Sequence, residues 1–248
     1  EEESLDLDMV TAVCPNSHIV LVEANTATKA ELGTAENQAI SQGANVVSNS
    51  YGGGETGASN SNYNHPGHII TASAGDSGYG AQQPCSYSTV VCIGGTSLSR
   101  ANNARGWSET AWSGSGSGCS RYVSKPSWQT DKGCTKRSES DVSADANPNT
   151  GVAVYDSYAY QGYQGWLVFG GTSVSSPLIA SVYALAGNAA SLNYAQSIWA
   201  AGGNAAELND VTSGSNGRCP RQYPYICRAG TGYDGPTGWG TPNGIGAL

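Results

Sequence analysis

The chain has 248 residues, which is enough for one large domain with a sizeable hydrophobic core. Its formal net charge is −8, and its 11 lysines and arginines form no cluster, so nucleic acid is not expected as a partner. No apolar run approaches the ~20 residues of a membrane helix, so no membrane contact is expected. No signal peptide is found either, as expected for the mature form of a secreted chain.

Charged residues make up only 12% of the chain. Such a chain accumulates little repulsion when its acids are protonated, so the composition suits an acid-tolerant protein. Seven cysteines and a single methionine are typical of an oxidising compartment, which predicts a secreted, extracellular protein. The closest spacings suggest three loop staples, Cys85–Cys92, Cys119–Cys134 and Cys219–Cys227. Cys14 is then free or paired outside this chain, although spacing alone does not determine the connectivity.

The first part of the chain alternates between helix and strand patterns. Apolar residues at helical spacing predict a helix over about 4–14, which ends before Pro15. A strand, a helix and three strands are then predicted, over about 18–23, 28–42, 44–50, 68–74 and 89–94, with a Gly/Ser/Asn loop at 52–64. This alternation is typical of an α/β fold with a mainly parallel sheet and helices on both faces.

The long polar segment 101–150 has no clear periodicity. Its Gly/Ser run at 114–118 could be a linker. Because loops carry specificity on α/β scaffolds, we favour a surface segment that binds substrate. Two strands, over about 151–156 and 166–169, are predicted between this segment and a glycine-rich turn.

Glu2 and Asp6 lie four residues apart in the first predicted helix, so they share one helix face. Like charges at this spacing repel, and one shared proton relieves the repulsion by raising one of the two pKa values. A carboxyl with a raised pKa is a base that works in acid, where histidine is protonated. The alternative is an acidic first turn that complements the helix dipole.

Asp76 follows the apolar pair Ile69-Ile70, in a segment that predicts a strand running into a turn. The C-terminal ends of parallel strands are where α/β proteins carry out their chemistry. In the alternative interpretation, Asp76 only forms an Asx-turn with Gly78.

Ser173 follows Gly170-Gly171-Thr172 and precedes an apolar run over 177–187. It is therefore predicted at the N-terminus of a helix whose first turn contains Pro177. Free N–H groups and the positive dipole end there favour a developing oxyanion, which suits a nucleophilic serine. The alternative is an N-cap serine, which is common.

A serine nucleophile needs a base, and histidine is the usual one. Of the three histidines, His18 begins an apolar run, and Pro66-Gly67 between His65 and His68 predicts a turn. We therefore favour a carboxylate base. A Ser-His-Asp hydrolase that uses His65 or His68 is the alternative enzyme.

Together these segments resemble the sedolisins, the serine-carboxyl peptidases. The motifs that carry the resemblance are Glu2-x-x-x-Asp6, the segment 72–78 around Asp76, and Gly171-Thr172-Ser173 followed by Pro177. The His-Gly-Thr-His segment of ordinary subtilisins is absent. The resemblance spans residues 2 to about 244. It implies a subtilisin-like α/β fold of three layers and a secreted, acid-active peptidase whose substrates are proteins or peptides.

The resemblance also implies a role for each residue. Ser173 attacks the peptide carbonyl and forms an acyl-enzyme, Glu2 is the general base, and Asp6 orients Glu2 and shares its proton. The backbone N–H of Ser173 and the protonated side chain of Asp76 stabilise the oxyanion. Tyr51 stands where several relatives carry tryptophan beside the acids.

A fourth match lies near the C-terminus, where two segments resemble the sedolisin calcium site. The implied ligands of one structural Ca²⁺ are the carboxylates of Asp210 and Asp234 and the carbonyls of Val211, Gly230 and Gly232. An all-oxygen set suits this hard cation. The glycines let the backbone turn its carbonyls inward.

Sedolisins carry a substantial part of the catalytic domain, including sheet strands, ahead of the acid pair. We therefore expect residues 1–248 to form a single peptidase catalytic domain without that N-terminal part. The missing part would be a separate chain of the same precursor, or be removed, disordered or outside this sequence. The alternative function is a secreted carbohydrate- or protein-binding module, which 34 glycines and 14 tyrosines would suit, or an inactive peptidase-like protein.

Overall fold

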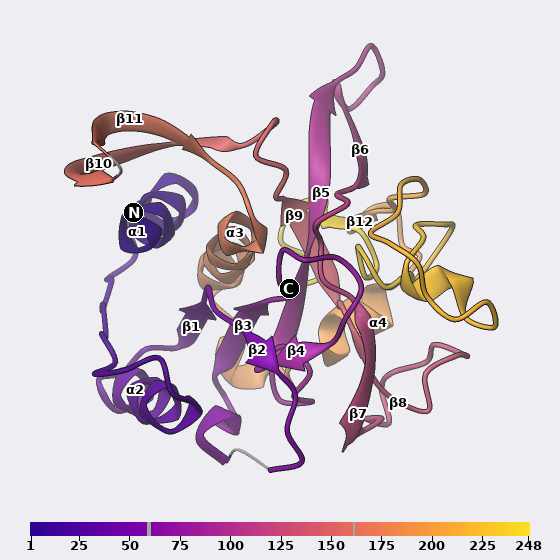
Figure 1. Cartoon of the computed structure of the whole chain (residues 1–248), viewed down its shortest axis with the longest axis horizontal. Helices are drawn as coiled ribbons and strands as arrows, with labels where there is room; N and C mark the ends of the chain where they lie inside the picture. Colours follow the sequence, from indigo (N-terminus) through magenta and orange to yellow (C-terminus); the bar gives the residue numbers. More distant parts are fainter. Residues whose placement is uncertain (59–60, 161) are drawn as a thin grey trace.

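The computed structural model describes residues 1–58, 61–160 and 162–248. Its centre is a five-stranded sheet (Figure 1). The strands of this sheet are β1 (Val46–Asn49), β3 (Ile69–Ser73), β5 (Val91–Arg100), β6 (Trp107–Ala111) and β9 (Val142–Asp145). The order is β1-β3-β5-β6, and β9 also pairs with β5. All pairs are parallel except β5 with β6.

Alternating side chains of the strands belong to two separate cores. Ile69 packs in the core that contains Tyr183 of helix α3 (Thr172–Ala186). Its neighbour Ile70 packs in the other core, with Tyr63. Because successive strand residues point to opposite faces, the sheet is covered on both sides.

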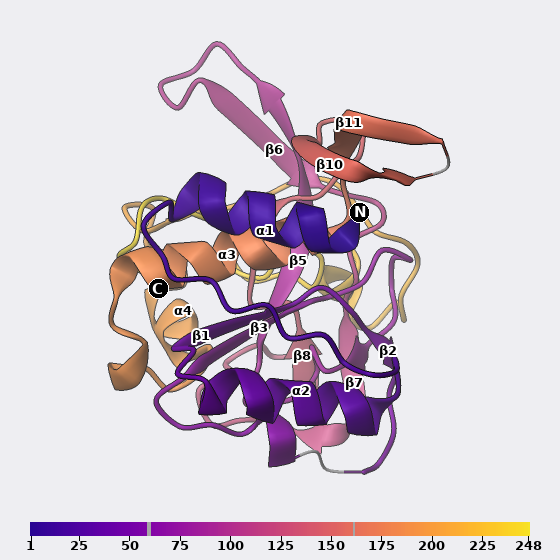
Figure 2. The same cartoon turned by 90° about the vertical axis from the view of Figure 1, so that its left-hand side faces the viewer.

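The helices complete three layers (Figures 1 and 2). Helix α3 lies against the sheet, and α1 (Glu2–Val13) packs on the outside of α3. On the other side, α2 (Lys29–Ser41) contacts β1 and the short helix η1 (Ser61–Tyr63). The predicted three-layer subtilisin-like α/β fold is confirmed, as is its mainly parallel sheet.

In the described part of the chain, four small two-stranded sheets and three further short helices lie around this centre. The sheets are the hairpin β10 (Val152–Tyr160)–β11 (Tyr163–Phe169), β7 (Gly118–Ser124)–β8 (Lys136–Glu139), β2 (Gly53–Gly54)–β4 (Gln82–Gln83) and β12 (Leu208–Asn209)–β13 (Thr241–Pro242). The helices are η2 (Ala189–Ser191), α4 (Gln196–Ala201) and η3 (Pro224–Ile226). The β10–β11 hairpin lies beside α1 and leads into α3.

The predicted strand over 18–23 is not formed. The apolar pattern identifies residues that suit a strand, but a strand also needs a neighbour to share its backbone hydrogen bonds. Among the described residues no strand pairs with this run, and Ile19 and Leu21 are 38% and 52% exposed. Strand β1 ends the sheet.

The segment 101–150 is more ordered than its polar sequence indicates. It contains β6, β7, β8 and β9, and β9 belongs to the central sheet. The Gly/Ser run at 114–118 is not a linker, because Ser115 and Ser117 are fully buried and Ser115 donates a hydrogen bond to the Pro236 carbonyl at 2.7 Å. A side chain at Gly116 would collide with the Ala74 carbonyl. Our preferred surface segment is therefore wrong for this run, which is packed inside the molecule.

The three suggested disulfides are all present, and Cys14 is free and buried. Cys85–Cys92 links the start of β5 to the turn before it, and Cys119–Cys134 joins β7 to the loop before β8.

Within the described ranges, no helix is both long and apolar enough to cross a membrane.

Candidate active site

Ser173 is the second residue of α3, which begins at Thr172 directly after Gly171. Gly171 has φ +98°, in the left-handed region that favours glycine, and it turns the chain from the β10–β11 hairpin into the helix. Ser173 is half-buried, whereas Thr172 and Val174 on either side are buried. The first N–H groups of a helix have no acceptor within it, so this position favours negative charge.

Pro177 lies further into α3 than predicted, as the sixth residue of the helix. Proline has no N–H, so the Ser173 carbonyl, four residues earlier, loses its usual helical donor. The hydroxyl of Ser50, just beyond the end of β1, donates to this carbonyl at 3.3 Å. The nucleophile candidate is thereby joined to the central sheet.

Helix α1 carries both predicted carboxyls, and it packs directly on α3. The Glu2 carboxyl lies close enough to the Ser173 side chain for their interaction to lower the pKa of Glu2. Asp6 accepts a bond from the Ser50 hydroxyl at 2.6 Å. Leu5 and Met9 lie on the same side of α1 as the two carboxyls and are buried in a core with Val174, which places the carboxyls beside the start of α3. The structure therefore brings Glu2, Asp6 and Ser173 together.

The electrostatics of the pair favour a retained proton. The pKa of Asp6 is raised to about 7, mainly by burial and also by the neighbouring Glu2 charge, while the Ser50 bond opposes the rise. Partial burial also raises the pKa of Glu2, the interaction with Ser173 opposes that rise, and the nearby Asp76 adds to it. Two neighbouring carboxyls cannot both ionise without a cost in free energy. The Glu2–Asp6 pair therefore keeps one proton in weakly acidic solution, where an ordinary carboxyl is already ionised.

Asp76 lies in the turn after β3 and contacts the start of α3. Its Oδ1 accepts bonds from the Thr172 N–H at 2.7 Å and the Thr172 hydroxyl at 2.9 Å. The same hydroxyl accepts from the Gly75 N–H at 3.0 Å. A side chain at Gly171 would meet Asp76 Oδ2 at 2.8 Å, so this carboxyl oxygen lies against the glycine that precedes the helix. The predicted Asx-turn with Gly78 does not appear among these bonds.

The sequence did not identify Thr172 and Ser50 as parts of this site. Each hydroxyl bridges two elements, Thr172 between α3 and the Asp76 turn, and Ser50 between α1 and α3. Their position is the available signal, because Ser50 ends a predicted strand and Thr172 precedes the predicted nucleophile. The side-chain amide of Gln82 packs on the backbone of Gly52 and Gly75, so closely that a side chain on either glycine would collide with it.

His65 and His68 do not join the site. They lie before β3, whereas Asp76 follows that strand at its other end. The His65 ring bonds to the Asn62 carbonyl and the His68 ring to the Ala44 carbonyl. The arrangement gives no support to a Ser-His-Asp site that uses them.

Two of the predicted calcium ligands, Asp210 and Asp234, lie near each other in the loops that follow β12 and precede β13. Asp210 Oδ2 accepts from the Gly232 N–H at 2.9 Å, and Asp234 Oδ2 accepts from the Gly230 N–H at 3.1 Å. Asp234 is 1% exposed, and its pKa is raised to about 8, mainly by burial and also by Asp210, against the bonds from Thr237 and Gly230. Two neighbouring carboxylates, one of them buried, are oxygen donors of the kind that a hard cation prefers.

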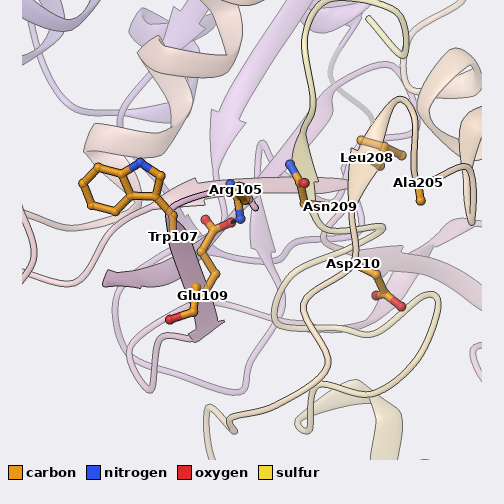
Figure 3. Close-up of a pocket in the computed structure, with 8 residues that line it drawn as sticks. Arg105, Trp107, Glu109, Ala205, Leu208, Asn209 and Asp210 are labelled. Atoms are coloured by element: carbon orange, nitrogen blue, oxygen red, sulfur yellow. Dashed lines mark hydrogen bonds and ion pairs between the residues drawn. The ribbon is translucent and has the colours of Figure 1, made fainter. Parts of the chain in front are cut away.

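Among the residues that the structure describes, no group of three or more His, Cys, Asp or Glu side chains could hold a metal. The predicted calcium set contains two carboxylates, and its other oxygens are carbonyls. A separate pocket of about 330 Å³ lies beside Asp210. Figure 3 shows Arg105, Trp107 and Glu109 on one side of it and Asn209 on the other. None of the predicted catalytic residues lines this pocket.

The chain matches the Subtilase family over residues 3–225. It is 31% identical over 205 residues to sedolisin from Pseudomonas sp. (strain 101), which covers 71% of this chain and 33% of that protein. It is also 31% identical over 205 residues to kumamolisin from Bacillus sp. (strain MN-32), covering 72% of this chain and 35% of that protein. The chain therefore spans about one third of the length of these relatives.

A solved structure shares the fold along nearly the whole chain. It is Pseudomonas sedolisin, described as a serine-carboxyl proteinase complexed with two molecules of pseudo-iodotyrostatin. The TM-score is 0.79 at 28% identity, and the match covers 98% of this chain and 76% of that chain.

Proposed function

Because the chain belongs to the subtilase family, as a sedolisin-like member with the subtilisin-like fold, we propose that it is a serine peptidase with a Ser173–Glu2–Asp6 triad. The observation that carries the proposal is that Glu2 lies close enough to the Ser173 side chain for their interaction to lower the pKa of Glu2. These residues lie in different helices, 171 positions apart in the sequence, yet the fold brings a candidate base beside a candidate nucleophile.

The chemistry follows from these contacts. The Ser173 oxygen attacks the carbonyl carbon of a peptide bond while its proton moves to Glu2. Glu2 then returns the proton to the leaving amine as the carbon–nitrogen bond breaks, and an ester with Ser173 forms. Water repeats the sequence, with Glu2 again as the base, and releases the acid and free Ser173.

The negative oxygen of each tetrahedral intermediate needs hydrogen-bond donors. The backbone N–H of Ser173, in the first turn of α3, is one candidate. Asp76 is the other, and it can donate only when its carboxyl carries a proton. Its bonds with Thr172 support this role, because they orient the carboxyl toward the start of α3.

Activity in acid is part of the proposal. Asp6 has a pKa of about 7, raised mainly by burial, so below neutral pH it carries the proton that the pair shares. Glu2 accepts the serine proton in its ionised form, whose share decreases as the pH falls below its raised pKa. The three disulfides and the low charge content support a secreted, extracellular protein.

One calcium ion is proposed at the Asp210 and Asp234 carboxylates and the Val211, Gly230 and Gly232 carbonyls. Bound there, it would neutralise two neighbouring carboxylates and hold together the loops that follow β12 and precede β13. Its contribution would be to the stability of the fold. The catalytic residues lie in other elements, and no step of the reaction involves it.

A further polypeptide segment is proposed as a partner, with residues 1–248 as one peptidase catalytic domain. The segment would come from the same precursor and supply sheet structure next to β1. Two observations support it: the apolar run 18–23 has the pattern of a strand, and β1 has no second neighbour within the described part of the chain. Parallel strands buried on both faces carry such continuous apolar runs.

The proposal is tested by digesting a peptide library at about pH 4, well below the reference pKa of histidine. The wild type is expected to cleave it, and Ser173→Ala is expected to be inactive but folded. A peptide aldehyde should form its adduct on Ser173, detected by mass spectrometry. An active alanine variant, or an adduct on another residue, would contradict the assignment. Binding of peptides without cleavage would indicate the binding module or the inactive relative.

A further inference from the structure

Glu36 is a buried carboxyl that the proposed reaction does not use. It lies on the buried face of α2 with Gly33 and Ala39, at a spacing of three residues, and is 2% exposed. Its Oε2 accepts a bond from the Asn49 side chain at 3.0 Å. Its Oε1 is buried and has no hydrogen-bond partner in the described part of the chain. A carboxylate in this position would therefore leave a charged oxygen unsatisfied.

The groups that face Glu36 provide no positive charge. Asn49 contacts it from the end of β1. Tyr51 and Tyr63 are the titratable groups near it, and their hydroxyls bond to each other at 2.8 Å. Burial raises the pKa of Glu36 to about 7, although the Asn49 bond opposes the rise. A neutral carboxyl group avoids burying a charge here, and an unpaired O–H on Oε1 costs less than an unpaired charged oxygen.

Glu36 is connected to the candidate active site through three consecutive residues. Asn49 also donates to the Thr71 carbonyl at 3.2 Å, which fixes it between α2 and β3. The next residue, Ser50, donates to Asp6 at 2.6 Å and to the Ser173 carbonyl at 3.3 Å. The third, Tyr51, is held by its bond to Tyr63. The segment 49–51 therefore joins α2 to both helices of the site.

We propose that Glu36, as a neutral acid, is a positioning residue that holds the segment 49–51 so that Ser50 contacts Asp6 and Ser173. When Glu36 ionises, its charge has no counter-ion, and the segment shifts to bring it toward water. The inference rests on the proposed peptidase function for its effect on catalysis. Its effect on stability does not depend on that function.

Two variants separate the hydrogen bond from the charge. Glu36→Gln keeps an acceptor for Asn49 and cannot ionise. At about pH 4 its kcat and KM are expected to equal those of the wild type, and above pH 6 it should retain more activity than the wild type. Glu36→Leu removes the acceptor, so kcat should fall about tenfold at every pH, with KM little changed. Glu23→Gln, a change at an exposed residue, is the matched control and should alter neither profile.

Thermal unfolding gives a readout that needs no catalysis. The melting temperature of Glu36→Gln minus that of the wild type should increase from pH 4 to pH 7.5, because only the wild type must bury a group that ionises in this range. If the difference is constant with pH, Glu36 is not the proposed neutral acid. If Glu36→Leu is as active as Glu36→Gln at pH 4, the bond to Asn49 does not position the site. If the wild type cleaves nothing, the proposed peptidase function fails, while the melting comparison still tests the state of Glu36.

Discussion

Pro177 leaves the Ser173 carbonyl without a helical donor, and this carbonyl bonds instead to the Ser50 hydroxyl at 3.3 Å. The same hydroxyl donates to Asp6 at 2.6 Å. A proline inside a helix usually costs stability, because a backbone acceptor loses its partner. Here the free carbonyl allows the Ser50 side chain to bond to both α3 and α1, and so to fix their relative position.

Ser50→Ala should therefore reduce activity by about ten- to a hundredfold, since a hydrogen bond to a charged or charge-sharing group contributes about 1.5–3 kcal/mol. The pKa of Asp6 should rise above about 7, because the lost bond is one that lowers it. A pH–activity profile measures both effects. Ser41→Ala is the control, since its exposed hydroxyl bonds to the Gln38 carbonyl of its own helix. Equal profiles for the two variants would exclude the bridging role.

Glu2→Gln should lower kcat by about 10²–10⁴, which is typical for removal of one general base. The adjacent Glu3→Gln, a change at an exposed residue of the same helix turn, should stay within about twofold of the wild type. Both are measured at about pH 4, below the reference pKa of histidine. A wild-type rate that increases through a histidine-like pKa near 6.5 and stays level above it would refute the carboxyl base.

Stability should decrease as pH rises through the pKa of Asp6. In the folded protein this pKa is about 7, against the ordinary aspartate value of 3.8, so the unfolded chain releases the proton at lower pH. The stabilisation is fully present below about pH 4 and is lost between about pH 4 and 7, at roughly 1.4 kcal/mol per pKa unit. Asp6→Asn should flatten this part of the curve, as followed by thermal unfolding. An unchanged curve for Asp6→Asn would mean that Asp6 ionises normally.

Gly171→Ala should cost far more activity than Gly43→Ala. Both glycines have positive φ, +98° and +92°, so alanine strains the backbone at both, at a cost of about 1–3 kcal/mol. Only the methyl group at 171 meets a neighbour, Asp76 Oδ2 at 2.8 Å, whereas the space around Gly43 is open. Both variants should lose melting temperature, and activity should be lost only at position 171. Equal activity in the two variants would show that Asp76 need not stay against the start of α3.

Calcium should raise the melting temperature at neutral pH. At a concentration a hundred times Kd, it should add about 2.7 kcal/mol to the free energy of unfolding. A chelator should reverse this, and Asp234→Asn should abolish it, because a buried ligand and its charge are removed. The exposed Glu23→Gln serves as the control. A melting temperature that does not respond to calcium in the wild type would contradict the proposed site.

The sequence predicted the parts of the fold that depend on local pattern. Helix α2 was expected over 28–42 and spans Lys29–Ser41, because its apolar spacing and its N-cap, Thr28, act within one helix. The strand predicted over 18–23 is wrong, because a strand depends on a pairing neighbour that its own residues do not encode. Strand β9 was missed because only four residues, Val142–Asp145, enter a sheet that other segments build.

The candidate site divides in the same way. Ser173, Glu2 and Asp6 could be proposed from spacing and from the helix ends that carry them. Ser50, Thr172 and Asn49 could not, because each acts by joining elements that are distant in sequence. Glu36 shows the same limit, since a glutamate in an amphipathic helix gives no sign that it will be buried.

Both proposed acid residues lie on a helix that belongs to the periphery of the molecule. Helix α1 is held by a small core of Leu5, Met9, Val154 and Val174 and by the Asp8 carboxylate, which accepts from the Tyr155 N–H at 2.8 Å. The central sheet has its own, larger cores. Local opening of α1 requires less energy than global unfolding, so it can separate Glu2 from Ser173 while the sheet stays intact. Heat inactivation would then begin as a reversible, local event that precedes loss of the fold.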